Sequence, residues 1–273
     1  SEKLKLVSLM GFDMVDLSAK DGDELSQVRM VEAPGPYGHE IRQAGTDIGL
    51  KLDELFICIM HDKGEELDVT TSDTAVREQI LTQFASYCEF AEAAGFNSIC
   101  LVPLWPSKEN RQEAWDNTVS ILKSFNTAAT ERGLLFNIEP VDFSLLETPD
   151  LACEMVQSVP GVGLTLDYSH WVSVEFEQSE IAKMLPHTRH MHIRQAKVGS
   201  RQQPVETGAI DFGEVTQRLL NMDFSGNLAI EHIDKIERSK YAPINSPVRQ
   251  VAELAARVKF TAEHEQVKQA PND

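Results

Sequence analysis

Short apolar runs that end in an acid or an imidazole recur along the chain. They occupy residues 134–139, 163–170, 190–194 and 228–232. Buried parallel strands typically read as such near-continuous apolar runs. A polar side chain at the last position of several parallel strands places carboxylates and imidazoles along one edge of the sheet. The pattern therefore predicts a metal or substrate site at that edge.

A second pattern connects helices to these strands. Apolar residues at helical spacing lead up to Gly11, Gly95 and Gly133, and a strand-like run follows each glycine within a few residues. Glycine suits the left-handed position just past a helix end. Helix, glycine and strand in repetition predict a wound parallel α/β fold. The strands expected from this pattern cover residues 14–18, 55–60, 98–103, 134–139, 163–167, 190–194 and 228–232.

Polar residues mark the expected helix starts. Residues 71–73 precede a helix that runs to Ala94, and Thr148 followed by Pro149 is a cap with proline at the first helical position. Asp211 with Glu214 three residues later resembles a capping box. Ser246 followed by Pro247 begins the last helix.

The strand count indicates a fold and leaves alternatives. Seven strands preceded by a helix over residues 4–10 suggest an eight-stranded (β/α)8 TIM barrel whose first strand is missing or irregular, formed as one domain over residues 1–273. Residues 4–10 could instead be that strand, but their Gly-Phe-Asp exit resembles the helix exit at Gly95. A doubly wound open sheet is the other alternative. It would gather its ligands at a switch point and usually carries a glycine-rich loop, which this sequence lacks.

Composition narrows the class of partner. The 273 residues carry a formal net charge of −18, which disfavours binding to nucleic acid in the absence of a basic patch. No apolar run approaches the roughly 18 residues of a membrane span. The four cysteines have no CxxC spacing, and the N-terminal residues lack the apolar core of a signal peptide. We expect a cytoplasmic protein with a small-molecule partner, and self-association stays open.

The polar residues at the strand ends are of the types that bind a divalent metal ion. Glu139, Asp167, His192 and Glu231 would bring three carboxylates and an imidazole together, and the carboxylates would repel one another without a cation. An oxygen-rich set without thiolate favours a hard divalent ion over structural zinc. We expect one ion, Mn²⁺ first, with Mg²⁺, Co²⁺ or Zn²⁺ as alternatives. A lone strand-end glutamate is usually only solvated, but four such ends in succession favour function.

Two further residues lie beside this set. Alternation along a strand puts His190, His192 and Arg194 on one face, so that one histidine is a ligand candidate. Arg194 is nearest the strand end, where a guanidinium can hold a hydroxyl, carboxylate or phosphate. His170 follows Asp167 by three residues and is expected to touch a bound substrate.

These motifs resemble the xylose-isomerase-like barrel superfamily, and within it the sugar phosphate isomerase/epimerase group. The resemblance runs from about residue 72 to 255 and is strongest at residues 136–140, 166–170, 190–194, 208–212 and 230–232. It implies an eight-stranded barrel with one divalent metal. The metal ligands it implies are Glu139, Asp167, His192 and Glu231, and the implied substrate contact is His170.

The resemblance also implies a reaction. A proton next to a carbonyl is removed through a metal-stabilised enediolate, with Glu139 and Glu231 as the acid/base pair and His170 or Arg194 holding a substrate O–H. This predicts an isomerase or epimerase of a small sugar or keto-sugar in carbohydrate metabolism. A metal-dependent dehydratase or lyase of a keto-sugar, keto-inositol or dehydroshikimate-like substrate is the alternative, and a non-catalytic sugar-binding barrel is a third.

The sequence departs from its relatives in two places. Leu145 stands where some ketose epimerases carry an acid six residues beyond the first metal glutamate, and residues 197–208 differ from the corresponding epimerase loop. The three-zinc endonuclease-IV type of this fold is disfavoured, since residues 201–211 contain no histidine and the chain is acidic.

Overall fold

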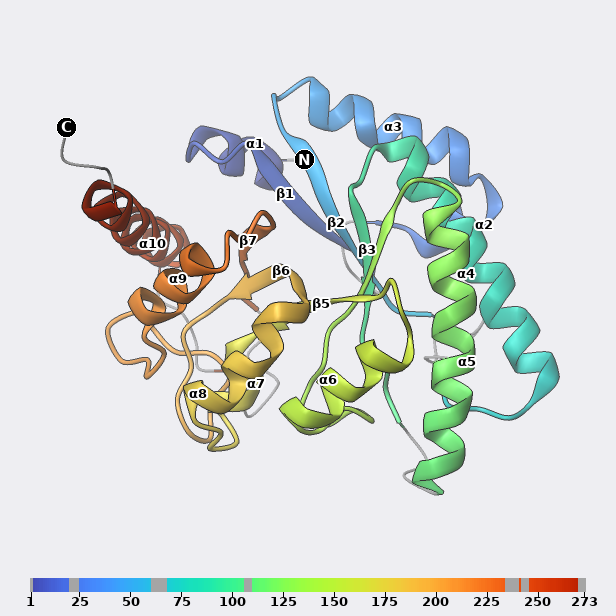
Figure 1. Cartoon of the computed structure of the whole chain (residues 1–273). Helices are drawn as coiled ribbons and strands as arrows, with labels where there is room; N and C mark the ends of the chain where they lie inside the picture. Colours follow the sequence, from blue (N-terminus) through green and yellow to red (C-terminus); the bar gives the residue numbers. More distant parts are fainter. Residues whose placement is uncertain are drawn as a thin grey trace. The chain divides into compact units, whose positions relative to one another are not determined.

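The computed structural model describes residues 2–19, 25–59, 68–105, 110–233, 241 and 246–269. Seven strands alternate with helices in this part of the chain and form one parallel sheet in chain order (Figure 1). The chain divides into two compact units, the first made of Ser1–Glu147 with Glu154–Leu164 and the second of Thr148–Cys153 with Thr165–Asp273. The predicted α/β class with seven parallel strands is confirmed.

The strands of the first unit pair with their neighbours along the sequence. The hydrogen-bonded ladders join β1 (Met14–Ala19) to β2 (Lys51–Ile57), β2 to β3 (Ser98–Leu101), and β3 to β4 (Leu135–Ile138). The fifth strand, β5 (Gly163–Asp167), begins beside β4 through the pairs Asn137↔Gly163 and Ile138↔Leu164. The β2 strand begins four residues before its predicted start, and the predicted end at Met60 lies outside the described residues.

The helices of this part begin and end where local chemistry favours it. They are α1 (Glu2–Leu9), α2 (Gln27–Glu32), α3 (Pro34–Thr46), α4 (Thr74–Ala94), α5 (Arg111–Thr130) and α6 (Pro149–Ser158). Asp73 caps α4 by accepting from the backbone N–H groups of Ala75 (2.8 Å) and Val76 (3.1 Å). Gly95 ends α4 at φ +83°, in the left-handed region. The predicted helix at the N-terminus, the predicted α4 start and the glycine exit are confirmed.

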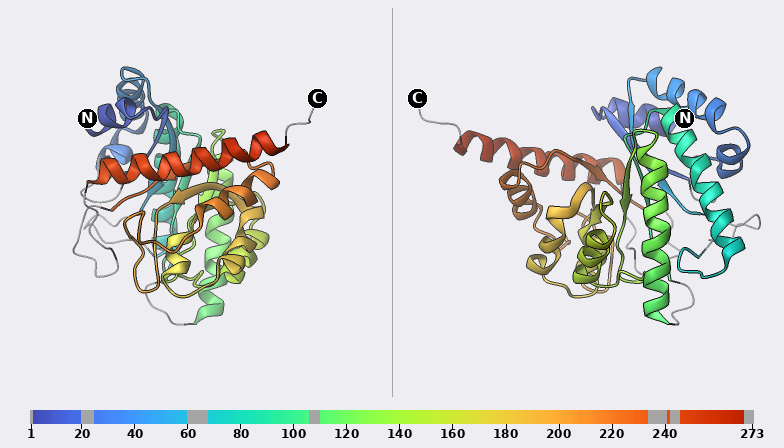
Figure 2. Two further views of the ribbon diagram at one scale, coloured as in Figure 1. Left: turned by 90° about the vertical axis from the view of Figure 1, so that its left-hand side faces the viewer. Right: turned by 45° about the vertical axis from the view of Figure 1, so that its right-hand side comes forward.

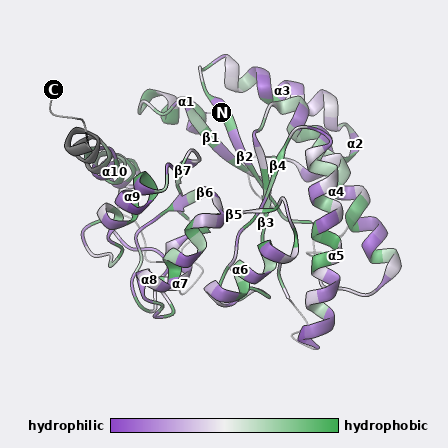
Figure 3. Cartoon of the chain, in the orientation of Figure 1, coloured by the Kyte–Doolittle hydropathy of each residue, from purple (hydrophilic) through white to green (hydrophobic). Residues whose placement is uncertain are grey.

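An aromatic cluster fills the space between two helices and the sheet. Phe84 of α4 stacks on Phe125 of α5 with ring centroids 3.9 Å apart. The ring of Phe136 in β4 is T-shaped to both, with centroid distances of 5.3 Å to Phe84 and 5.8 Å to Phe125. All three side chains are fully buried. Figure 3 shows hydrophobic and hydrophilic residues interspersed along α4 and α5, as expected of helices with one face on a sheet.

Helices α2 and α3 were not predicted from the sequence. Their segment contains Pro34, Pro36 and three glycines, which disfavour a helix interior by propensity. Packing explains at least one of the glycines. A Cβ on Gly38 would lie 2.6 Å from the backbone oxygen of Phe90 in α4, so the close approach of α3 to α4 requires glycine there. Tertiary packing overrides local propensity in this segment.

Among its described residues, the second unit contains the start of α6, the end of β5, the last two strands and four further α-helices. The helices are α7 (Tyr168–Val172), α8 (Gln178–Ile181), α9 (Phe212–Asn221) and α10 (Pro247–Gln269), and a 3₁₀ helix covers Ala182–His187. Strands β6 (Thr188–Ile193) and β7 (Asn227–Ile230) pair in parallel, with His192 opposite Ala229 and Ile193 opposite Ile230. Helix α10 packs along α9 (Figure 2). The predicted caps at Asp211 and before Pro247 fall at the starts of α9 and α10.

The expectations about the cysteines and about membrane spans can be compared with this fold. All four cysteines have free thiols. No helix among the described residues is long and apolar enough to cross a membrane.

Candidate active site

Asp167 ends strand β5 and also begins helix α7. Its Oδ1 accepts a hydrogen bond from the backbone N–H of Ser169 (2.7 Å), and its Oδ2 accepts one from the Ser169 hydroxyl (2.8 Å). The first of these bonds is the usual N-cap interaction, which satisfies an N–H group that the helix leaves without a partner. A strand that passes directly into a capped helix thus fixes a carboxylate with no solvent exposure.

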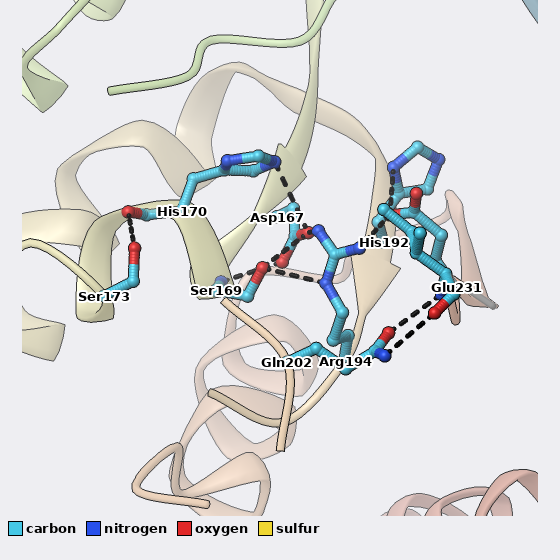
Figure 4. Close-up of polar contacts among 9 residues, drawn as sticks. Asp167, Ser169, His170, Ser173, His192, Arg194, Gln202 and Glu231 are labelled. Carbon is cyan, nitrogen blue, oxygen red and sulfur yellow. Dashed lines mark hydrogen bonds and ion pairs between the residues drawn. The ribbon is translucent and has the colours of Figure 1, made fainter. Parts of the chain in front are cut away.

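Arg194, one residue beyond β6, neutralises this carboxylate. Its Nη2 donates to Asp167 Oδ2, and its Nε donates to the Ser169 hydroxyl at 3.0 Å (Figure 4). The arginine side chain is only 1% exposed. Burial by itself would raise the pKa of Asp167, but the positive charge of Arg194, with contributions from His170, His192 and the Ser169 hydrogen bond, holds the pKa below its ordinary value.

The β6–β7 register brings Glu231 to the same place. Ile193 lies opposite Ile230, and the backbone N–H of Glu231 extends the ladder by donating to the Ile193 carbonyl at 3.2 Å. Arg194 and Glu231 therefore follow the paired ends of adjacent strands. Arg194 Nη1 lies 3.3 Å from Glu231 Oε2, and His192 Nδ1 lies 3.5 Å from the same oxygen. The arginine thus contacts two of the candidate ligand carboxylates.

The two remaining candidate histidines of this unit are also buried. His170, on α7, has its Nε2 3.8 Å from Asp167 Oδ2. His190 stands nearly perpendicular to His192 with ring centroids 5.5 Å apart, as expected for side chains two residues apart on one strand face. Of the two histidines of the His-x-His motif, His192 approaches Glu231, with 3.5 Å between Nδ1 and Oε2, which supports the choice made from the sequence.

Glu139 belongs to the first unit. It directly follows β4, its backbone N–H continues the ladder to the Leu101 carbonyl at 2.9 Å, and its side chain is 5% exposed. The predicted strand-end position is therefore correct. The second unit itself brings together Asp167, His170, His192, Arg194 and Glu231, and the participation of Glu139 in the same site stays a prediction.

Sequence reasoning missed several residues that organise this site. Gln202 is 1% exposed and forms two hydrogen bonds to the backbone of Ile233, accepting from its N–H (2.8 Å) and donating to its carbonyl (3.0 Å). Ile233 lies two residues beyond Glu231. The Tyr241 ring lies 5.3 Å from Arg194 Cζ, within cation–π range. Only Ser169 had a local signal, since a serine two residues after a strand-end aspartate can complete a cap.

The donor set can be compared with the needs of a divalent ion. A carboxylate offers about four lone-pair directions. Within the described part of the chain, the contacts of Asp167 with Ser169 and Arg194 account for three, which leaves one on Oδ1 for a metal bond. Glu231 is the most accessible of the set, with a side chain 36% exposed, and the set contains hard oxygens and one imidazole. These residues fit a hard divalent cation.

Parallel strands that end in carboxylates and imidazole are the arrangement of an enzyme of the TIM-barrel class. The family model for the xylose isomerase-like TIM barrel matches residues 4–258, and the chain belongs to this family. The family and the TIM-barrel fold predicted from the sequence are thereby confirmed.

Three relatives illustrate the range of the family. A protein of Danio rerio named "Putative hydroxypyruvate isomerase" is 29% identical over 126 residues, which span 43% of this chain and 45% of that protein, so the match covers less than half of its length. The structure of an L-ribulose 3-epimerase is similar with a TM-score of 0.77 at 16% identity, covering 100% of this chain and 93% of that one. A xylose isomerase-like TIM barrel protein from Mycobacterium smegmatis in complex with magnesium has a TM-score of 0.68 at 17% identity, covering 96% and 87%.

Proposed function

We propose that this protein is a divalent-metal-dependent isomerase or epimerase of a small keto-sugar or related hydroxy-carbonyl compound. Three lines support the proposal: the family, the isomerase and epimerase named among its relatives, and the set formed by buried Asp167 and His192 with the half-buried Glu231. The single observation that carries it is the convergence of His192 and Arg194 on Glu231 at the paired ends of β6 and β7.

In the proposed site, Glu139, Asp167, His192 and Glu231 hold the ion. When bound, a divalent ion supplies Lewis-acid polarisation of a carbonyl and an adjacent hydroxyl. The relative from Mycobacterium smegmatis has magnesium in its structure, which supports a hard cation for this chain too. The choice of Mn²⁺ as the native ion is part of the proposal.

The proposed proton transfers belong to the two glutamates. Glu231 is the more exposed of the two, at 36% of its side chain, so it is the better placed to reach the C–H next to a carbonyl. It takes this proton and an enediolate forms. Return of the proton to the neighbouring carbon, with the hydroxyl proton passing to the former carbonyl oxygen, is one outcome, and delivery of a proton by Glu139 to the opposite face of the same carbon is the other. The first outcome is isomerisation and the second is epimerisation.

His170 and Arg194 are the proposed substrate contacts. His170 is 5% exposed, and its Nε2 lies 3.8 Å from Asp167 Oδ2, next to a proposed metal ligand. Arg194 is engaged through all three of its nitrogens by Ser169, Asp167 and Glu231. Because a guanidinium has five N–H donors, Arg194 can keep these contacts and also donate to a substrate oxygen.

The alternative of a lyase or dehydratase gains no support from these relatives, which are an epimerase and an isomerase by name. Both reactions begin with the same proton removal, so the product decides between them.

Solvent exchange tests the proposal. The protein is incubated with Mn²⁺ in D₂O with hydroxypyruvate or L-ribulose, the compounds named in its relatives, and with further ketoses, and proton NMR follows the C–H groups next to the carbonyl. Deuterium entry with the carbon skeleton and hydroxyl count unchanged supports an isomerase or epimerase. Loss of water would instead establish a dehydratase. The matched control is Glu214→Gln, which removes an exposed glutamate on α9 and should leave exchange unchanged.

A further inference from the structure

Arg194 is a buried arginine whose guanidinium faces two carboxylates, those of Asp167 and Glu231. Its Nε donates to Ser169 Oγ at 3.0 Å, its Nη2 donates to Asp167 Oδ2, and its Nη1 lies 3.3 Å from Glu231 Oε2 (Figure 4). The Tyr241 ring lies 5.3 Å from its Cζ. A guanidinium does not deprotonate in proteins, so a permanent positive charge stands between two carboxylates at the strand ends.

These two carboxylates are also proposed ligands of the divalent ion. The guanidinium uses one of the lone pairs of Asp167 Oδ2 and is attracted to the same Glu231 oxygen that His192 approaches. A divalent ion that binds these oxygens must share them with Arg194 or displace it, and both choices bring two positive charges close together in a buried place. Like charges in such an environment oppose each other strongly.

We propose that Arg194 is a built-in counter-cation that competes with the divalent ion for Asp167 and Glu231. This inference rests on the proposed function, because it takes these two carboxylates as metal ligands. Arg194 keeps the acids of the site together when the ion has dissociated, and it weakens binding of the ion when the ion is present. It affects metal binding through the carboxylates, and in this role it is a positioning residue, separate from the substrate contact proposed above.

The competition predicts two effects of opposite sign. Removal of the positive charge should destabilise the protein in chelator, because Asp167 is then buried without its cation. The same change should tighten binding of the metal, because a repelling charge and a competing hydrogen bond are both lost. Coupling between linked sites typically amounts to roughly 5- to 150-fold in affinity. A residue with a purely structural role would weaken both properties together.

The test measures Mn²⁺ affinity and thermal unfolding of the whole chain in wild type, Arg194→Met, Arg194→Gln and Arg194→Lys. Protein stripped with chelator is titrated with Mn²⁺, and the free ion is followed by electron paramagnetic resonance. We expect Arg194→Met and Arg194→Gln to bind Mn²⁺ at least about fivefold more tightly and to unfold at lower temperature in EDTA. Arg194→Lys, which keeps the charge, should bind nearly as weakly as wild type.

The matched control is Arg218→Met on α9, which removes an exposed arginine paired with Glu214 and should change neither property. Equal or weaker Mn²⁺ binding in both neutral Arg194 variants would overturn the inference. If Arg194→Met does not fold, the comparison of Arg194→Gln with Arg194→Lys decides the question. A wild-type protein that binds no Mn²⁺ would instead remove the proposed function, so the two failures are distinguishable.

Discussion

The guanidinium of Arg194 donates to the carboxylate of Asp167 where neither side chain is appreciably exposed to solvent, at 1% and 0%. The two residues come from the ends of different strands, and Ser169 binds both through its hydroxyl. The positive charge of Arg194 compensates the cost of burying the Asp167 carboxylate at the end of β5. Because breaking a buried pair leaves one charge without compensation, the pair has measurable consequences for stability.

Removal of the negative partner should be strongly destabilising. Asp167→Asn leaves the Arg194 charge buried beside a neutral amide, and the expected loss in the free energy of unfolding is about 3–5 kcal/mol. Urea unfolding at pH 7 in EDTA measures it. The matched control is Asp150→Asn, which breaks the exposed Lys183–Asp150 pair (3.0 Å) and should change stability by no more than about 1 kcal/mol. An Asp167 variant as stable as this control would contradict the account.

The same pair predicts the sign of a pH dependence. The pKa of Asp167 is lowered in the folded state, whereas an unfolded aspartate titrates near an ordinary pKa of about 3.9. Its contribution to stability is therefore fully present above that ordinary pKa and is lost as the pH falls through the lowered value of the folded state. Urea unfolding in EDTA between about pH 2.5 and 6 should show a steeper acid-side loss of stability in wild type than in Asp167→Asn. Parallel profiles would show that Asp167 does not contribute.

Gln202 should be necessary for the segment after Glu231. Its amide accepts from and donates to the backbone of Ile233, and it is 1% exposed. Gln202→Glu keeps the shape but loses the donor, so the Ile233 carbonyl faces a carboxylate, at an expected cost of about 1–3 kcal/mol in unfolding free energy. The control is Gln217→Glu, a half-buried glutamine on α9 whose amide donates to the Asn221 side chain at 3.0 Å. Equal effects of the two changes would refute the role of Gln202.

The cluster of Phe84, Phe125 and Phe136 should dominate the stability of the first unit. All three rings are fully buried, and Phe125 contacts the other two. Phe125→Ala should lower the free energy of unfolding by about 3–5 kcal/mol through lost burial and a cavity. Denaturant unfolding of this variant is compared with Phe143→Ala, whose side chain is 41% exposed and whose replacement should matter little. A loss below about 1 kcal/mol at Phe125 would be unexpected.

The thiol of Cys88 should be chemically inert in the folded protein. Burial raises its pKa to about 12, so at pH 8 only about one molecule in ten thousand carries the reactive thiolate. Alkylation with iodoacetamide, followed by peptide mass spectrometry, should modify the half-buried Cys153 before Cys88. In urea both should react. Early labelling of Cys88 in the native protein would show that α4 opens more readily than its packing implies.

Much of the fold was predictable because its signals are local. Apolar runs gave all seven strands, and Gly95 and Asp73 marked the two ends of α4 through their own backbone and side-chain chemistry. Helices α2 and α3 were missed because the reason for Gly38 is its contact with Phe90, a residue more than fifty positions away. Propensity cannot encode such a contact.

The candidate site also contains residues that could be predicted from local sequence and residues that could not. His192, Arg194 and Glu231 were predicted because parallel register brings consecutive strand ends together. That Arg194 would be buried between two carboxylates was not predicted, since alternation tells which face a side chain takes and not which partner it meets. Gln202 was not predicted, because its partner is the backbone after β7. The sequence does not distinguish a loop glutamine that binds such a backbone from one that is only solvated.

We propose that one divalent ion binds at Asp167, His192 and Glu231, and Glu139 as a fourth ligand stays a prediction from the sequence. The most direct measurement is the Mn²⁺ stoichiometry and affinity of chelator-stripped protein, compared in wild type, Glu231→Gln and Glu214→Gln. We expect one ion per chain in wild type and Glu214→Gln, with binding at least about tenfold weaker in Glu231→Gln while its circular dichroism spectrum is unchanged. No bound Mn²⁺, Mg²⁺, Co²⁺ or Zn²⁺ in wild type, or equal affinity in all three proteins, would contradict it.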